Sequence, residues 1–253
     1  FGERALSGEI RRIDAGRSAS AEGDRQAYYQ RLREVFDDIA HTRDGYYDAP
    51  AGSPDRRHTF WQRLNRGHIR RILTPLMGAG SLRSYLDVGC GRGDFSHELA
   101  QQFELDRLHG IDLSAAVVEV AQSSYGRDSA PVMAFSVADV TSGLSFADRA
   151  FDIVGCLNVF HHLLPADQIA AIGHLCRVAD RLVLLEVKRF HILHRLLTGY
   201  RAMGTLDFYA VRVPEVVARF AEHGFRPLVI RPIFYLHALS PIVVLAMART
   251  DGA

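Results

Sequence analysis

The sequence predicts an α/β fold: a doubly wound, mostly parallel sheet of seven strands with a helical cap before it and an antiparallel hairpin at its C-terminal end. From residue 84 onward, short apolar runs alternate with amphipathic stretches, as in parallel sheets with helices on both faces. The last two apolar runs have no helix between them, which indicates antiparallel pairing. The chain has 253 residues, 48% of them hydrophobic and 23% charged, so it can bury such a core.

The N-terminal part is predicted to be helical after a flexible lead-in. Residues 1–24 are rich in Ser, Ala, Gly and charge. Asp24 is a candidate cap for a helix over 25–40, and a loop rich in Gly and Pro separates that helix from a second one over 56–73. The second helix carries a basic face, which we interpret as solvated. We therefore assign 25–83 as an N-terminal helical cap.

The remaining residues, 84–253, form the predicted sheet domain. Strands are predicted over 84–88, 108–112, 132–137, 151–157, 182–187, 225–236 and 242–248. Helices are predicted over 94–103, 115–125, 165–176 and 214–223. The segment 189–212 follows the fifth strand and lies outside this alternation, so we treat it as an insertion.

A glycine-rich loop after the first strand carries the most information. Asp87 ends the strand, and Gly89, Gly91 and Gly93 follow at alternate positions before a helix. Glycine lets a ligand approach the backbone closely, and the loop lies at the carboxyl edge, where open α/β sheets bind ligands. A dinucleotide site is expected to show G-x-G-x-x-G, so this spacing disfavours a nicotinamide dehydrogenase. The acid before the loop suits a cationic group, such as the ammonium of an amino acid.

Two more acids follow the next two strands. Asp112 ends the second strand, where an acid can accept hydrogen bonds from both ribose hydroxyls. Ser114 is then expected to cap the following helix. Asp139, beside the apolar Val140, follows the third strand, where it can bind an adenine amino group. The fourth strand runs into a polar end at Asn158.

These motifs, in this order and spacing, resemble the class I S-adenosylmethionine-dependent methyltransferases of the small-molecule type, over roughly 84–249. The resemblance implies a Rossmann-like fold and S-adenosyl-L-methionine as cofactor. It implies that Asp112 and Leu113 hold the ribose, that Asp139 and Val140 flank the adenine, and that Asn158 lies near the sulfonium. The methionine part would be surrounded by Asp87, Gly89, Cys90, Gly91 and Gly93.

Two adjacent histidines lie where a base would be needed. Methyl transfer requires alignment and exclusion of water, and a base only where the acceptor loses a proton. His161 and His162 follow the fourth strand, and an imidazole titrates near pH ~6.5, so either is a candidate base. The alternative is that one of them binds backbone and caps the helix that Pro165 opens. Glu186, at the end of the fifth strand, either orients a base or substrate or is a plain polar strand end.

Aromatic residues outside the cofactor fold predict where the acceptor binds. The resemblance implies that the N-terminal cap and the 189–212 insertion form a lid over it. The candidate substrate-binding residues are Tyr47, Trp61, Phe190, Tyr200 and Tyr209. An apolar lid favours a small acceptor with apolar surface, such as a natural product, an aromatic compound or a lipid. The alternative is that these side chains pack the lid onto the sheet. Arg66 or Tyr47 is a candidate contact for the cofactor carboxylate.

Composition limits the partners and the compartment. Lys and Arg number 30 against 29 Asp and Glu, so there is no general attraction to nucleic acid, and a membrane surface is a minority interpretation. Lys188 is the only lysine, which we attribute to codon usage. The three cysteines fit neither a disulfide framework nor a zinc site, and His191 and His194 lack a carboxylate partner, so no metal is predicted. Without a bilayer-spanning apolar run or a signal-peptide core, we expect a cytoplasmic protein.

The sequence thus predicts an enzyme that transfers a methyl group to an oxygen or nitrogen atom of a small molecule. It leaves the acceptor and the oligomeric state open. One alternative is a methyltransferase for RNA or protein, disfavoured by the charge and by the Asn158-Val159-Phe160-His161 segment, which lacks the usual motif of those enzymes. A second is a non-methylating enzyme of the same fold, such as a cyclase or decarboxylase. A third is an inactive partner subunit, against which the intact loop and the three acids argue.

Overall fold

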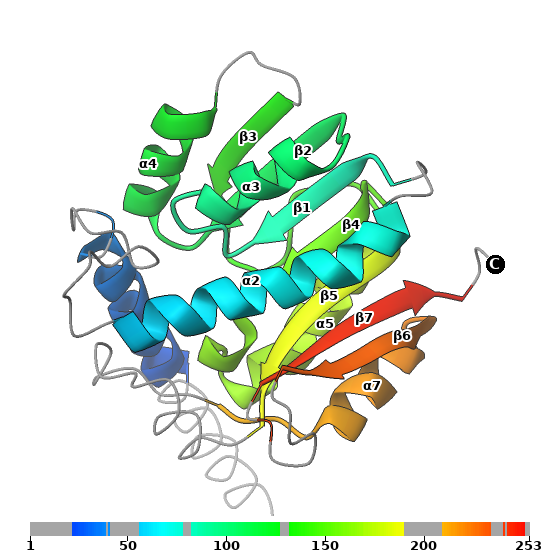
Figure 1. Ribbon diagram of the computed structural model, residues 1–253. Helices are drawn as coiled ribbons and strands as arrows, with labels where there is room; N and C mark the ends of the chain where they lie inside the picture. The colour runs from blue at the N-terminus through cyan, green and yellow to red at the C-terminus, as the bar shows by residue number, and fades with distance from the viewer. Residues whose placement is uncertain are drawn as a thin grey trace, which may run out of the picture.

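The computed structural model describes residues 22–38, 40, 56–77, 82–126, 132–189, 209–233, 240 and 242–250, and the side chains of these except 56–62. They form a seven-stranded sheet with helices on both faces, as predicted (Figure 1). The strands are β1 (Ser84–Val88), β2 (Arg107–Asp112), β3 (Val132–Val137), β4 (Phe151–Cys156), β5 (Ala179–Lys188), β6 (Phe225–Pro232) and β7 (Ile242–Arg249). The helices are a helix over 22–38, α2 (Arg56–Met77), α3 (Asp94–Gln102), α4 (Ala115–Tyr125), the 3-10 turn η1 (Phe160–His162), α5 (Pro165–Val178) and α7 (Val213–Glu222).

The strand order is β3-β2-β1-β4-β5-β7-β6, and it decides where a ligand can bind. The first five strands run parallel, while β7 lies antiparallel between β5 and β6. The chain moves outward from β1 to β3 and then returns to place β4 on the other side of β1. The connection after β1 therefore runs toward β2, and the connection after β4 runs the opposite way, toward β5. Such a switch point opens a crevice at the carboxyl ends of β1 and β4.

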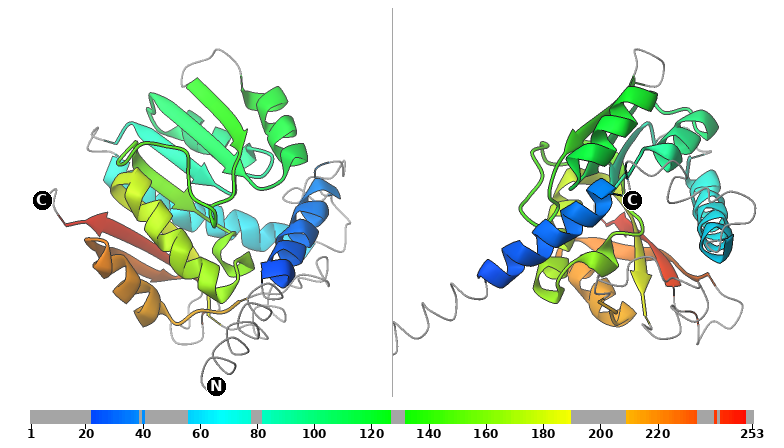
Figure 2. Two further views of the ribbon diagram at one scale, coloured as in Figure 1. Left: turned by 180° about the vertical axis from the view of Figure 1, so that it is seen from behind. Right: turned by 90° about the vertical axis from the view of Figure 1, so that its left-hand side faces the viewer.

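Strand side chains alternate between two hydrophobic layers. Tyr85 and Ile153 pack against α2, α3 and α4, whereas Leu86 and Val154 pack against α5, α7 and the helix over 22–38. Figure 2 shows α5 and α7 on one face of the sheet and α2 on the opposite face. The central strands are buried on both faces, as expected for a parallel sheet. This rigid centre fixes the strand ends that carry the predicted site residues.

Three local expectations need correction. The N-terminal helix includes residue 22, and Asp24 lies inside it rather than at its cap, because Glu22 bonds to Gln26 and pairs with Arg25 in the first turn. The helix α2 continues four residues past the predicted end, since Met77 extends its buried stripe. The basic face of α2 is not uniformly solvated, because the Arg66 side chain is only 12% exposed.

Other expectations fall on residues that the structure leaves undescribed. They concern the lead-in before residue 22, the loop over 42–55 and most of the 189–212 insertion. Within the described residues, no helix is both long enough and apolar enough to cross a membrane.

Candidate functional site

Two cavities meet at the carboxyl ends of β1, β2 and β4. We call the first the capped cavity, because the helix over 22–38 lies over it. It is lined by Tyr29, Leu32, Phe36, Val88, Gly89, Gly91, Arg92, Ile111, Asp112, Leu113, Val117, Ala138, Asp139, Val140, Asn158, Val159, His162 and Leu163. The second, the α2-side cavity, is lined by Asn65, Arg66, Ile69, Asp87, Gly89, Cys90, Asp94, Phe95, Leu157 and Asn158. Gly89 and Asn158 line both, so the two cavities adjoin at these residues.

The glycine loop forms the boundary between the cavities. Gly89 has φ 76°, and a Cβ on it would lie 1.9 Å from Cγ2 of Val159, so any other residue would strain the backbone and displace Val159. The amides of Gly89 and Cys90 donate to the Ile111 carbonyl at 2.7 and 3.0 Å, which ties the loop to β2. A Cβ on Gly91 would meet nothing within 4 Å, so the bare backbone faces open space in the capped cavity.

Asp112 joins the glycine loop to the turn before α4. Its Oδ2 accepts from the Gly91 amide at 2.9 Å and its Oδ1 from the Ser114 amide at 3.0 Å. Burial raises the pKa of Asp112, and these backbone hydrogen bonds oppose that rise. The hydroxyl of Ser114 accepts from the Val117 amide at 3.2 Å, so the predicted helix cap is confirmed.

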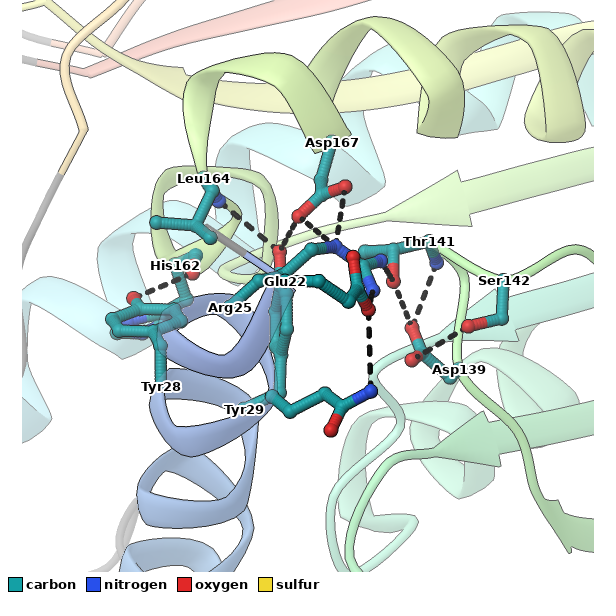
Figure 3. Close-up of polar contacts among 11 residues, drawn as sticks. Glu22, Arg25, Tyr28, Tyr29, Asp139, Thr141, Ser142, His162, Leu164 and Asp167 are labelled. Carbon is teal, nitrogen blue, oxygen red and sulfur yellow. Dashed lines mark hydrogen bonds and ion pairs between the residues drawn. The ribbon is translucent and has the colours of Figure 1, made fainter. Parts of the chain in front are cut away.

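Asp139 lies at the end of β3 on the far side of the capped cavity. It accepts from the amide and hydroxyl of Thr141 at 2.8 and 2.7 Å and from the Ser142 hydroxyl at 3.0 Å (Figure 3). These bonds hold the carboxylate at the cavity wall beside the buried Val140. Asp112 and Asp139 therefore bracket one cavity from neighbouring strands.

Asp87 supplies a buried acid to the α2-side cavity. Its side chain accepts from the Ser96 hydroxyl at 2.5 Å. Burial raises the pKa of Asp87 to about 6; the nearby Asp112 charge adds to the rise, while the Ser96 bond and Arg66 oppose it. Burial likewise raises the pKa of the Cys90 thiol in the same wall. The wall of this cavity thus contains a buried acid whose charged form is disfavoured by burial and only partly favoured by Arg66.

The helix over 22–38 is fastened over the capped cavity at its N-terminal half by Asp167 of α5. The Tyr29 hydroxyl donates to Asp167 at 2.7 Å, and Arg25 Nε lies 3.1 Å from both of its oxygens (Figure 3). The Tyr28 hydroxyl donates to the His162 carbonyl at 2.7 Å. Arg25 also donates to Thr141 at 2.9 Å, next to Asp139. This set of bonds links the helix to both the α5 and β3 sides of the cavity.

The other half of the same helix contacts the β2 side. Arg33 donates to the Leu113 carbonyl at 3.4 Å, and the Ser114 hydroxyl donates to Asp37. Between these two attachments the helix places Tyr29, Leu32 and Phe36 in the cavity wall. The apolar face of the helix was visible in the sequence, but nothing there showed which cavity it covers.

The two histidines take different positions. His162 lines the capped cavity, and burial followed by the charge of Lys188 lowers its pKa to about 3. His161 is also buried, with its ring centre 4.2 Å from that of His162, but it lines neither cavity. Its carbonyl accepts from the Tyr209 amide at 2.8 Å. His162 is therefore a neutral imidazole at physiological pH, facing the site.

The remaining predicted residues divide into three groups. Gly93 lies outside both cavity walls, immediately before α3. Tyr209 also lies outside both walls, where its ring packs 6.1 Å from that of Tyr28. The other acceptor candidates fall outside the described residues or side chains, namely Tyr47, Trp61, Phe190 and Tyr200.

The α2 helix supplies residues that the sequence reading largely missed. Asn65 and Arg66 line the α2-side cavity, and Arg66 pairs with Glu98 at 2.6 Å. Asn65 donates to the fully buried Glu186, which also accepts from Lys188 at 2.5 Å. Glu186 is therefore not a plain strand end. The signal in the sequence was a polar residue, Asn65, one helical turn before Ile69 on a buried stripe.

Comparison with known proteins places this site in context. A family model described as a methyltransferase domain matches residues 86–181. The O-methyltransferase cnsE of Penicillium expansum is 32% identical over 149 residues, which cover 58% of this chain and 51% of that protein. The magnesium-protoporphyrin O-methyltransferase of Synechocystis is 33% identical over 122 residues, which cover 47% of this chain and 50% of that protein.

A solved structure extends the likeness beyond the matched sequence. The crystal structure of magnesium protoporphyrin IX methyltransferase (ChlM) from Synechocystis, with bound SAM, has a TM-score of 0.65 at 20% identity. The likeness covers 88% of this chain and 97% of that one, and at this identity it shows the fold alone. This chain spans about half the length of the two curated relatives described above.

We expect Asp87→Asn to stabilise the protein at neutral pH. The native pKa of about 6 lies above the ordinary value of 3.8, so the unfolded chain binds fewer protons between these values. The Asp87 carboxyl therefore lowers the free energy of unfolding as the pH rises through that window. An asparagine at this position has no charge and can still accept the hydrogen bond from Ser96. Urea unfolding should show a gain of up to about 3 kcal/mol above pH 6 and little change near pH 4. A variant that loses stability equally at both pH values would contradict this account.

We expect Asp167→Ala to release the helix over 22–38. The change removes the acceptor shared by Tyr29 and Arg25. Hydrogen exchange in that helix should accelerate by roughly tenfold or more, which corresponds to about 1.4 kcal/mol of local stability. Asp148→Ala, which breaks a surface pair with Arg177 at 2.8 Å, is the matched control. Equal exchange in the two variants would show that Asp167 does not fasten the helix.

Proposed function

We propose that the chain, which matches a methyltransferase domain over residues 86–181, is a class I S-adenosylmethionine-dependent methyltransferase that transfers a methyl group to an oxygen or nitrogen atom of a small molecule with apolar surface. One observation carries the proposal. Asp87, Asp112 and Asp139, each at the end of its own strand, line two adjoining cavities on either side of the glycine loop. The curated relatives are O-methyltransferases, which favours oxygen as the acceptor atom.

The residues present fit the proposed cofactor. The bare backbone at Gly91 leaves room for a ligand, as the open space around its missing Cβ indicates. In the capped cavity, Asp112 would accept from the ribose hydroxyls, and Asp139 from the adenine amino group. The acidic α2-side cavity suits an ammonium, because a cation offsets the burial of Asp87. When bound, S-adenosylmethionine supplies an electrophilic methyl group on a sulfonium.

The described residues on the acceptor side exclude water and orient the reactants. Leu32, Phe36 and Val159 give the capped cavity an apolar wall. A neutral His162 places no positive charge beside a sulfonium, and its ring can hydrogen-bond an acceptor hydroxyl. Because a pKa of about 3 makes it a weak base, it suits an acidic acceptor such as a phenol better than an aliphatic alcohol. His161 remains a candidate base, and because it lines neither cavity it would act through His162, whose ring centre lies 4.2 Å away.

Binding of S-adenosylhomocysteine tests the proposal directly. Asp112→Ala should weaken binding at least tenfold, because it removes the ribose acceptor and the anchor of the Gly91 amide. Asp106→Ala, which breaks an exposed pair with Arg83 at 2.7 Å at the start of β2, should bind like the wild type. Titration calorimetry measures both. If the wild type shows no binding at high micromolar concentration, the proposed function is wrong.

The affinity for S-adenosylhomocysteine should fall as pH drops below about 6. Asp87 has a pKa of about 6 in the free protein, and a bound ammonium would hold that pKa lower, so protonation of Asp87 opposes binding. The dissociation constant should rise by up to about tenfold per pH unit below pH 6. Asp87→Asn should bind weakly, with little pH dependence in this window. A wild-type affinity that is constant from pH 5 to 7.5 would contradict the role of Asp87.

A further inference from the structure

The α2-side cavity contains a buried amide that the glycine-loop motifs do not explain. Asn65 is 3% exposed and lines this cavity together with Asp87 and Asn158. Asn65 and Asn158 are the only asparagines in the chain. Asn65 projects from α2 one turn before the buried Ile69, so a polar group occupies a position where this helix otherwise buries apolar side chains.

The orientation of this amide is fixed by its neighbour. Asn65 bonds to Oε2 of Glu186 through its side chain. A carboxylate only accepts hydrogen bonds, so the amide must present its NH₂ group to Glu186. The carbonyl oxygen Oδ1 must then point elsewhere.

A buried ion pair holds Glu186 in turn. Lys188 Nζ lies 2.5 Å from Oε1 of Glu186, and the two side chains are 6% and 0% exposed. Both carboxylate oxygens are thus engaged, one by Lys188 and one by Asn65. The compact ammonium of a lysine fits here, whereas an arginine would bring five donors in a planar fork into this buried place. Lys188, the only lysine of the chain, therefore has a structural reason beyond codon usage.

The carbonyl oxygen of Asn65 has no hydrogen-bond partner among the described residues. A buried acceptor without a donor is costly, and native proteins rarely keep one without a reason. The same cavity contains the buried acid Asp87, and a second cation beside Arg66 would further favour its charged form. An acceptor oxygen and a carboxylate in one wall together match a group that is both a cation and a hydrogen-bond donor.

We propose that Asn65 Oδ1 accepts a hydrogen bond from the ammonium of the cofactor's methionine part, and that the Glu186–Lys188 pair is the positioning device for this amide. The proposal rests on the proposed function, since it names a further binding residue for the same cofactor. It connects β5, which carries Glu186 and Lys188, to recognition of the cofactor. Asn65 thereby contributes to selecting a ligand with a free amino group.

The assignment of Asn65 is tested by measuring the affinities of two ligands for the wild type and for an Asn65 variant. The ligands are S-adenosylhomocysteine and the analogue in which hydrogen replaces its α-amino group. Asn65→Leu should weaken binding of S-adenosylhomocysteine about ten- to hundredfold and binding of the analogue less than about twofold. Asn65→Ser is a second variant with the same expected pattern if the leucine variant does not fold. Thr74→Ala, on the exposed face of α2, should leave both affinities unchanged.

Two double variants test the positioning role of the ion pair. Both remove the two charges, but only one keeps an acceptor for the Asn65 NH₂ group. Glu186→Gln with Lys188→Met should retain the preference for the amino group, while Glu186→Leu with Lys188→Met should reduce it about tenfold or more. A merely structural ion pair would change the two ligands' affinities in parallel.

The outcomes separate this inference from the proposed function. If the wild type binds S-adenosylhomocysteine and Asn65→Leu weakens both ligands equally or neither, the assignment of Asn65 is overturned while the proposed function stands. If the two double variants behave alike, the positioning role of Glu186 is overturned. If the wild type binds neither ligand, the proposed function fails and this inference fails with it.

Discussion

The carboxylate of Asp112 is the interaction on which the candidate site depends. It accepts from the amides of Gly91 and Ser114, and so joins the loop after β1 to the turn after β2. Both loops lie at the switch point of the sheet, where crossovers diverge and leave a crevice. Once these loops are joined, the missing side chain at Gly89 lets Val159 approach and closes the wall between β1 and β4. The helix over 22–38 then bonds to Leu113 and Ser114, beside the same carboxylate.

Burial of ionisable side chains sets the protonation states in the site and lowers the stability of the folded protein. Burial raises the pKa of Asp87 to about 6 and lowers that of His162 to about 3, so each of these groups is driven toward its neutral form. Glu186 and Lys188 are also buried, and they form an ion pair with each other at 2.5 Å. A cationic ligand in the α2-side cavity would offset the cost at Asp87. Stability and binding are therefore expected to oppose each other at this residue.

The sequence predicted the sheet domain well because its signals are local. The alternation of β1 to β5 with helices and the lack of a helix between β6 and β7 predicted the mostly parallel sheet with its antiparallel end, and the three predicted acids at the strand ends line the two cavities. The helix over 22–38 was predicted, but its place over the capped cavity depends on Asp167, more than a hundred residues away in the chain. The link from Asn65 to Glu186 is equally distant. Such long-range polar contacts leave no periodic pattern in a single sequence.

The central claim is that the two cavities form one site for S-adenosylmethionine, divided at the glycine loop. A crystal structure of the protein with S-adenosylhomocysteine tests it most directly. The account predicts the adenosine in the capped cavity, with the ribose at Asp112 and the adenine at Asp139. It predicts the amino-acid end in the α2-side cavity, with the ammonium beside Asp87 and Asn65. A ligand bound at another edge of the sheet, or with its amino-acid end under the helix over 22–38, would contradict the account.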